Sequence, residues 1–525
     1  MRIICRIFNL IQSVYKKDIL YFVLLFILLT ITDAYYHFIN SLYLNCLYNV
    51  ISAYWGSTII CFILLCINNK TIRKFLRFSI LIFLLLYAII NYYSIALTLV
   101  PLDNGVISLI LSTNVIEISE FIKSYIPTEH IITMIIVIVG IFYILSRKLY
   151  LKAPIVIKIL SCVFIFTILI QLCIPNSRKG QPYGRIIRIF QYNRTVVFTP
   201  DLNQYKNYPT FEPTMNLHPE NIVVIIGESF AKTHSSLYGY HKETNPLLQV
   251  HQKDSNLFVF QNVKSPATQT IEAFKAIMNT YSYARGEKEW YECLTIPESF
   301  KTIGYKTIWI SNQSQYGAHE NISTRFAQLC DTVIFTQKSV FEKHYDEEII
   351  RYLKEEPKEN ELFILHLWGQ HSCYSERYPE KFNVFTENDY LELSSHQRKN
   401  VSEYDNATLY NDFVVDSIIN IFKEKETIIF YFPDHGEDIY FSDKNYCGHG
   451  IKVNAQSDSI GKDIPLMIYT SLVFKDKFPL LIDKIQKSTN RVFNTEDIIF
   501  SLIDISGYKF KNNNDVEKYS LFTPE

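Results

Sequence analysis

Acidic and histidine side chains follow the ends of predicted strands in the C-terminal part of the chain. Glu228 comes directly after the apolar run 221–227, and Asp434 and His435 follow the run 427–432. Runs of β-branched and aromatic residues closed by Gly or Pro predict buried strands, and open α/β sheets bind ligands at the carboxyl ends of their strands. Carboxylate oxygens with an imidazole nitrogen suit zinc or manganese. The sequence therefore predicts a shared divalent metal site.

A threonine stands at the start of a predicted helix and could supply a nucleophile. The segment SPATQT (265–270) leads straight into a run with helical apolar spacing that begins at Thr270. A hydroxyl bound to a metal has a lowered pKa, and a helix N-terminus favours an anion such as phosphate. The alternative is that Thr268 or Thr270 caps the helix, which is the usual role of threonine there.

Two histidines lie in glycine-containing segments of the same part of the chain. His371 belongs to GQH (369–371), after the apolar run 362–368, and His449 belongs to GHG (448–450). Each alone is more often a surface, core or loop residue. Together with the predicted metal site they indicate acid–base chemistry, because histidine titrates near neutral pH.

The elements that must position these side chains alternate from residue 221 onward. Strands are predicted at 221–227, 257–263, 306–311, 362–368, 427–432 and 464–469. Helical spacing is found at 270–284, 296–303, 339–356 and 403–424, and a final helix is expected within 494–507. This alternation predicts an α/β domain with a central, mostly parallel sheet.

The N-terminal part is dominated by apolar runs long enough to cross a bilayer. Five spans are predicted, at 19–38, 44–67, 78–100, 131–145 and 155–174. The short loops 68–74 and 146–152 and the N-terminal 18 residues are basic, which places all three in the cytoplasm. With an odd number of spans, everything after residue 174 is then external.

The segments between these parts have their own patterns. Amphipathic spacing predicts a helix on the outer face within 101–127 and an interfacial helix near 184–198. Asp33 and His37 lie in the outward half of the first span, where an ionisable residue is either functional or solvated near the interface. The predicted domains are 1–175 with five transmembrane helices, 176–220 as interfacial helix and linker, and 221–525 as the catalytic domain.

Composition limits the possible functions. A chain of 525 residues is expected to contain more than one domain, and its net charge of −1 gives no indication of nucleic acid binding. The ten cysteines form no CxxC pair, so a zinc ribbon is not expected.

These features resemble the membrane phosphoethanolamine transferases of Gram-negative bacteria, within the alkaline phosphatase/sulfatase superfamily. Their architecture is five transmembrane helices followed by an external sulfatase-like domain. The matching motifs occur in order as GES (227–229), SSLYGYHKETNP (235–246), SPATQT (265–270), SNQ (311–313), GQHSCYSERYP (369–379), YDN (404–406), DHGE (434–437) and GHG (448–450).

The resemblance implies roles for particular residues. Thr270 would be the nucleophile and also a metal ligand, and the resemblance selects it over Thr268. The remaining implied residues are the metal ligands Glu228, Asp434 and His435, the catalytic histidines His371 and His449, and the substrate-binding residues Asn312, Gln313, His366 and Glu437. The implied cofactor is Zn²⁺, one ion or two, with Mn²⁺ as the alternative.

The implied reaction moves phosphoethanolamine from phosphatidylethanolamine to lipopolysaccharide core, lipid A or another surface glycan through a phospho-threonine intermediate. The enzyme would be a multi-pass protein of the bacterial inner membrane with its catalytic domain in the periplasm, in contact with the lipid bilayer. We expect a monomer that binds no nucleic acid. Pro266 and Ala276 stand where the lipid A-modifying members have cysteines, which favours an acceptor in the lipopolysaccharide core sugars or another surface glycan.

Other readings of the same residues lead to different substrates. A phosphoglycerol transferase of the lipoteichoic acid synthase type would share the spans, the threonine and the metal site. A sulfatase-like hydrolase would need a C/S-x-P-x-R motif, which SPATQT does not provide. A non-enzymatic, glycan-binding membrane protein would not need the set Glu228, Thr270, Asp434 and His435.

Overall fold

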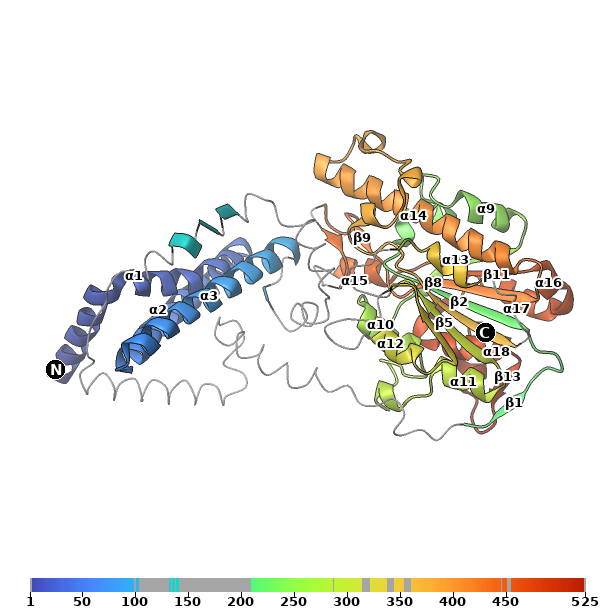
Figure 1. Cartoon of the computed structure of the whole chain (residues 1–525), viewed down its shortest axis with the longest axis horizontal. Helices are drawn as coiled ribbons and strands as arrows, with labels where there is room; N and C mark the ends of the chain where they lie inside the picture. The colour runs from blue at the N-terminus through green and yellow to red at the C-terminus, as the bar shows by residue number, and fades with distance from the viewer. Residues whose placement is uncertain are drawn as a thin grey trace. The chain divides into compact units, whose positions relative to one another are not determined.

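The computed structural model describes residues 2–98, 101–102, 132–133, 135–136, 138–140, 209–286, 288–313, 322–337, 344–353, 360–444, 446–450 and 455–523. These residues fall into two compact units, one containing the described residues up to 140 and the other those from 209 onward (Figure 1).

The N-terminal unit is built on three long helices, α1 (Arg2–Ile39), α2 (Tyr43–Cys66) and α3 (Lys70–Thr98), and α1 packs against both others. Within the part of the chain that the structure describes, two stretches are long and apolar enough to cross a membrane, Leu20–Phe38 and Lys70–Ile95. The described residues of the predicted spans 19–38, 44–67 and 78–100 lie in α1, α2 and α3, except Ile67, which follows α2. The structure does not confirm five spans, since 131–145 and 155–174 lie largely or wholly outside the described residues.

A buried polar contact joins α1 to α3. Asn91 Nδ2 donates hydrogen bonds to Thr32 Oγ1 (2.8 Å) and Asp33 Oδ1 (3.0 Å), while Asn91 Oδ1 accepts one from the backbone N–H of Leu102 (2.8 Å). Asp33 therefore contributes to helix packing in this unit. The predicted outer-face helix and the 184–198 helix lie outside the described residues.

The described residues of the C-terminal unit contain a seven-stranded sheet of order β3-β11-β8-β2-β7-β5-β6. Its strands are β2 (Asn221–Gly227), β3 (Leu257–Phe260), β5 (Lys306–Ser311), β6 (Thr332–Phe335), β7 (Glu361–His366), β8 (Thr427–Pro433) and β11 (Leu466–Thr470).

The sheet is mixed, and four of its six strand pairings are parallel, in agreement with the predicted mostly parallel sheet. Strand β11 runs antiparallel to both neighbours, β3 and β8, whereas the pairs from β8 through β2, β7 and β5 to β6 are parallel. The strand β6 was not predicted, because its four residues at the sheet edge are only partly buried and lack a long apolar run. All strand ends that carry the predicted site belong to the parallel part.

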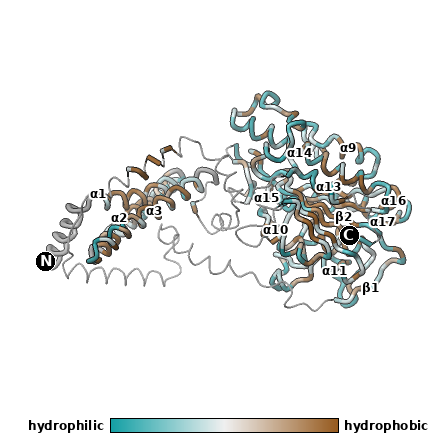
Figure 2. Tube along the Cα trace, in the orientation of Figure 1, coloured by the Kyte–Doolittle hydropathy of each residue, from teal (hydrophilic) through white to brown (hydrophobic). Residues whose placement is uncertain are grey.

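Two hydrophobic cores lie on opposite faces of this sheet. Ile222, Val224 and Ile226 point into one core and Val223 and Ile225 into the other, as the two-residue period of a strand requires. Figure 2 shows the strands as the most apolar segment of this unit. Burial on both faces explains why β2 reads as a continuous β-branched run.

Helices cover both faces. The core that contains Ile222 includes residues of α10 (Thr270–Ile277), α11 (Ile296–Thr302), α12 (Ile322–Ala327), α16 (Leu472–Lys477), α17 (Pro479–Lys487), α18 (Ile498–Ile505) and α19 (Asp515–Tyr519). The core that contains Val223 includes residues of α9 (Pro246–Lys253), α13 (Glu348–Tyr352) and α14 (Ser395–Phe422).

The remaining elements are α15 (Ala455–Lys462) and three short pairings. Strand β1 (Phe211–Pro213) pairs with β13 (Tyr508–Phe510), β4 (Asn262–Lys264) with β12 (Val492–Asn494), and β9 (Asp438–Ile439) with β10 (Cys447–Gly448). The predicted helix 270–284 is shorter than expected, because Asn279 leaves it to form a β-bridge with Thr295.

Candidate metal and nucleophile site

The register between β2 and β8 brings the first two acidic residues together. Gly227 is the partner of Pro433, so Glu228 and Asp434 leave the sheet side by side, and the N–H of Asp434 donates to the carbonyl of Gly227 (3.1 Å). A Cβ on Gly227 would lie 2.6 Å from the Tyr431 hydroxyl, so the close packing of Tyr431 against Gly227 leaves no room for a side chain there.

A buried histidine lies between these carboxylates. His435 Nε2 is 3.1 Å from Glu228 Oε1 and 3.5 Å from Asp434 Oδ2, and the three side chains are at most 1% exposed. The other ring nitrogen, Nδ1, is 2.9 Å from the carbonyl oxygen of Gly436, to which its N–H can donate. This contact fixes the ring so that Nε2 faces the two acids.

The hydroxyl of Thr270 completes the cluster. Thr270 is the first residue of α10, while Gln269 occupies the N-cap position. Its Oγ1–H donates to Glu228 Oε1 (3.2 Å), and Oγ1 lies 3.3 Å from His435 Nε2. The structure therefore places this hydroxyl against two of the predicted metal ligands.

The spacing of these atoms fits a single zinc ion. Four ligands about 2.0–2.1 Å from a tetrahedral zinc lie about 3.3 Å from one another. The contacts of His435 and Thr270 given above are 3.1, 3.2, 3.3 and 3.5 Å. Among the described residues, the buried Asp434 Oδ2 has no hydrogen-bond partner, which is a strong reason to expect a cation there.

The charges of the site also favour a cation. Burial and the charge of Glu228 raise the pKa of Asp434 to about 8. Burial lowers the pKa of His435, but the charges of Asp434 and Glu228 outweigh it and raise this pKa to about 10. Burial raises the pKa of Glu228, yet His435 holds it below its usual range. The two acids thus favour a positive charge on the His435 ring between them, and a metal ion could supply that charge instead.

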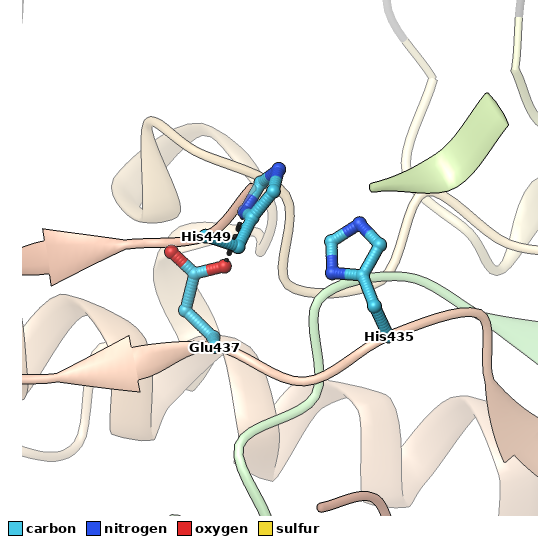
Figure 3. A group of neighbouring side chains, drawn as sticks. All are labelled: His435, Glu437 and His449. Carbon is cyan, nitrogen blue, oxygen red and sulfur yellow. Dashed lines mark hydrogen bonds and ion pairs between the residues drawn. The ribbon is translucent and has the colours of Figure 1, made fainter. Parts of the chain in front are cut away.

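A second group of ligand-type side chains adjoins the first. His435, Glu437 and His449 each offer one ligand atom within 4.8 Å of the others. His449 Nδ1 is 2.6 Å from Glu437 Oε2, and the Tyr374 hydroxyl donates to Glu437 Oε1 (2.9 Å). Figure 3 shows the Glu437–His449 pair beside the His435 ring.

His371 lies at the outer side of this group. Its ring centroid is 6.5 Å from that of His449, whereas the rings of His435 and His449 are 4.2 Å apart. His435 is buried, whereas His449 and His371 are partly exposed.

The predicted substrate-binding residues differ from one another in what their side chains contact. Gln313 Nε2 donates to Glu228 Oε2 (3.3 Å) and to the carbonyl of Leu367 (3.2 Å). Asn312 is fully buried, and its Nδ2 donates to the carbonyl of His344 and to Asp346 Oδ1, both at 2.9 Å. The amide of Asn312 is thus engaged with protein partners.

His366 is also fully buried, at the end of β7. Its Nδ1 is 3.2 Å from Ser311 Oγ, and its ring lies against those of Phe274 and Trp309. Burial lowers the pKa of His366 to about 4. Among the described residues its Nε2 has no hydrogen-bond partner.

Sequence reasoning missed three residues that support the site. Ser229 adopts φ 55° and its Oγ donates to Glu228 Oε1 (3.1 Å). The Tyr404 hydroxyl donates to the carbonyl of Ser229 (2.7 Å) and accepts from the N–H of Ala231 (2.6 Å). Asp346 contacts two strand-end loops. The motifs GES and YDN pointed to the first two, but Asp346 had no local signal inside its predicted helix.

The close approach of Gly369 to Glu228 supports one prediction. Gly369 has φ 55°, and a Cβ there would lie 2.7 Å from the backbone N of Glu228. Gly369→Ala should cost about 1–2 kcal/mol of backbone strain and displace Glu228, weakening zinc binding about tenfold or more. Zinc titration against a chromophoric chelator measures the effect.

A matched control separates strain from displacement. Gly304 has φ 92°, and no described atom lies within 4 Å of a Cβ built there. Gly304→Ala should therefore show a similar loss of stability with unchanged zinc affinity. Equal zinc affinity in both variants would contradict the role of Gly369.

The fold and the site define an α/β protein with a buried carboxylate–histidine–threonine cluster at the carboxyl ends of parallel strands. The sequence profile of the family described as Sulfatase matches residues 220–508. The chain belongs to the sulfatase family, as its motifs predicted.

Curated proteins similar to this chain are named phosphoethanolamine transferases. The phosphoethanolamine transferase EptC of Escherichia coli O18:K1:H7 is 29% identical over 350 residues, which cover 64% of this chain and 60% of that protein. The phosphoethanolamine transferase EptA of Helicobacter pylori is 26% identical over 491 residues, covering 87% of this chain and 88% of that protein. These relatives confirm the resemblance to phosphoethanolamine transferases.

Solved structures agree with the fold. The C-terminal periplasmic domain of EptC from Escherichia coli, crystallised in complex with Zn, matches with a TM-score of 0.55 and 27% identity over 61% of this chain and 91% of that one. The integral membrane protein lipooligosaccharide phosphoethanolamine transferase A from Neisseria meningitidis matches with a TM-score of 0.66 over 94% of this chain and 97% of that one. At 16% identity, the second likeness shows the fold alone.

Proposed function

We propose that this chain transfers phosphoethanolamine from phosphatidylethanolamine to a surface glycolipid, the lipopolysaccharide core or lipid A. The observation that carries the proposal is the Thr270 hydroxyl, 3.2 Å from Glu228 Oε1 and 3.3 Å from His435 Nε2. A nucleophile in direct contact with the metal ligands is the arrangement that a phospho-threonine intermediate needs. The similarity to named phosphoethanolamine transferases supports the substrate class.

The metal site holds one zinc ion in this proposal, through Glu228, Thr270, Asp434 and His435. Zinc would lower the pKa of the threonine hydroxyl and balance negative charge on the phosphoryl oxygens. The chain's own contribution is orientation. Glu228 accepts the hydroxyl proton in a hydrogen bond, and the carbonyl of Gly436 holds the His435 ring in place.

Transfer proceeds in two displacements at phosphorus. In the first, Thr270 Oγ1 loses its proton and forms a bond to phosphorus while the bond from phosphorus to the diacylglycerol oxygen breaks, and that oxygen gains a proton as diacylglycerol leaves. In the second, an acceptor oxygen forms the new bond to phosphorus, its proton is removed, and the Thr270 oxygen leaves and is protonated again. Each step therefore needs one proton donor and one acceptor.

His371 and His449 are the proposed proton carriers. Glu437 holds His449 through a 2.6 Å contact at Nδ1, which leaves Nε2 available to a substrate oxygen. Gln313, His366 and Glu437 contribute to the substrate environment. For Asn312 we assign a positioning role, because its amide contacts His344 and Asp346.

A second zinc ion would have to be held by Glu437 and His449 of the group His435, Glu437 and His449, because both ring nitrogens of His435 are already engaged, Nε2 in the first site and Nδ1 with the carbonyl of Gly436. Counting bound metal by atomic emission in the purified full chain, and in Glu437→Gln, distinguishes one ion from two. Manganese in place of zinc is the alternative result of the same measurement.

The location follows from the donor. Phosphatidylethanolamine and diacylglycerol both stay in the bilayer, so an enzyme that consumes one and releases the other must work at its surface. We place the chain in the bacterial inner membrane with five spans, the domain from residue 221 in the periplasm, and one copy per active unit.

Mass spectrometry tests the proposal. The full chain is expressed in Gram-negative cells without their own phosphoethanolamine transferases, and their lipopolysaccharide should gain one phosphoethanolamine on core or lipid A. In vesicles, the purified chain should release diacylglycerol from phosphatidylethanolamine. Release from phosphatidylglycerol alone would instead indicate a phosphoglycerol transferase, and free phosphoethanolamine without modified glycolipid would indicate a hydrolase.

A further inference from the structure

Asp346 is a buried carboxylate that contacts two loops at the carboxyl ends of the sheet. It is 4% exposed and lies just before α13. Its Oδ1 accepts hydrogen bonds from the N–H of Trp368 (2.8 Å) and from Asn312 Nδ2 (2.9 Å), and its Oδ2 accepts one from the N–H of Gly369 (2.9 Å). One side chain therefore ties the loop after β5 to the loop after β7.

The first of these loops leads to the side chain of Glu228. Asn312, held by Asp346, is followed by Gln313, whose Nε2 donates to Glu228 Oε2 (3.3 Å). The N–H of Asn312 also donates to the carbonyl of His366 (2.9 Å), which joins this loop to the end of β7. The position of the Glu228 carboxylate thus depends on a loop that Asp346 holds.

The second loop leads to the backbone of Glu228. The N–H of Gln370 donates to the carbonyl of Glu228 (3.0 Å). A Cβ on Gly369 would come within 2.7 Å of the Glu228 nitrogen, which measures how closely the two backbones pack. The same loop continues into His371, so the placement of the loop also affects this proposed proton carrier.

We propose that Asp346 is a positioning residue for the metal site: it holds Glu228 from two sides, through Asn312–Gln313 at the carboxylate and through Gly369–Gln370 at the backbone. This inference rests on the zinc site of the proposed function. Among the described residues, the hydrogen bonds of the Asp346 carboxylate go to Asn312, Trp368 and Gly369, none of which is a proposed metal ligand, so its effect would be transmitted through these loops.

Residues that orient metal ligands from outside the coordination shell commonly change metal affinity or activity by about 10–100-fold. Asp346→Asn keeps the volume of the side chain but directs an amide N–H₂ at one of the N–H donors of Trp368 and Gly369. The loss of that hydrogen bond should let one loop move away from Glu228. We expect zinc affinity to fall by about tenfold or more in the full chain, together with kcat.

A second buried carboxylate in the same unit offers a matched control. Asp412 is fully buried and accepts hydrogen bonds from the N–H groups of Leu247 (2.9 Å) and Leu248 (3.0 Å), at the start of α9. Asp412→Asn makes the same chemical change to a carboxylate with the same kind of partners. It should lower the thermal stability of the chain and leave zinc affinity unchanged.

The test is a competition titration of zinc against a chromophoric chelator for the purified full chain in detergent, with thermal unfolding of each variant in parallel. Zinc affinity reduced in Asp346→Asn and unchanged in Asp412→Asn supports the inference. Equal zinc affinity in both variants overturns it, whatever their stability. Asn312→Ala, which interrupts the Gln313 branch alone, should weaken zinc binding less than Asp346→Asn.

This variant also serves if Asp346→Asn does not fold. An Asn312→Ala chain with the parent's zinc affinity would then overturn the inference, and a weakened affinity would support it. Failure of the proposed function gives a different result, since a chain that binds zinc but transfers no phosphoethanolamine leaves the role of Asp346 intact. A parent chain that binds no zinc would contradict both the proposed function and the role of Asp346.

Discussion

Thr270→Ala should abolish phosphoethanolamine transfer. The change removes the hydroxyl that we propose forms the covalent intermediate, so diacylglycerol release from phosphatidylethanolamine vesicles should fall by about 10⁴-fold or more. The three remaining ligands, Glu228, Asp434 and His435, should still bind zinc, more weakly. Diacylglycerol is measured by chromatography, and the absence of a phosphorylated peptide containing Thr270 is checked by mass spectrometry.

The control for this variant is Thr268→Ala. The methyl group of Thr268 packs against Gly461, where a Cβ would approach it to 2.9 Å. Its loss should cost about 1 kcal/mol of stability and leave transfer near the parent rate. A Thr270→Ala chain that keeps a tenth of the parent's activity would rule out the covalent mechanism.

The second large effect is expected for Glu228→Gln. The amide keeps the size of the side chain but removes the charge that binds the cation, so zinc affinity should fall by more than about 100-fold. Zinc at 100 times its dissociation constant stabilises a folded chain by about 2.7 kcal/mol. Zinc should therefore raise the melting temperature of the parent by several degrees and that of Glu228→Gln by a small fraction of this, since the same zinc concentration stabilises the variant by at most about 0.4 kcal/mol.

Glu298→Gln is the matched control for this measurement. Glu298 is a buried carboxylate of the α11 capping box, where it accepts from the N–H and hydroxyl of Thr295. Its replacement should lower the melting temperature in every condition, by about 1 kcal/mol of unfolding free energy, and leave the zinc-induced shift intact. A zinc-induced shift in Glu228→Gln as large as that of the parent would exclude Glu228 as a ligand.

The sequence predicted those parts of the site that have a local cause. The β-branched run 221–227 must be buried on both faces, so its end, and therefore Glu228, could be placed at the ligand-binding edge. The same reasoning placed Asp434 and His435. For Thr270, the residue pattern alone left capping open, and only the resemblance favoured a nucleophile; the hydrogen bonds to Glu228 and His435 are tertiary contacts.

Features set by long-range contacts could not be predicted from the sequence. The direction of β11 depends on how the chain returns to the position between β3 and β8, which no local pattern specifies. Asp346 acts through hydrogen bonds to residues 22 to 34 positions away in the sequence. The local pattern around it therefore predicts only a helix. Asn312 was expected at the substrate because of the SNQ motif, while the fold directs its amide to Asp346.

The side-by-side exit of Glu228 and Asp434 from β2 and β8 has a consequence for the order of folding. The two strands are far apart in sequence, with Asn221 paired to Thr427, so their pairing is strongly non-local. The metal site cannot exist before that pairing forms, so the unfolded chain offers zinc no equivalent binding place. Bound zinc should therefore slow unfolding and leave the rate of folding almost unchanged.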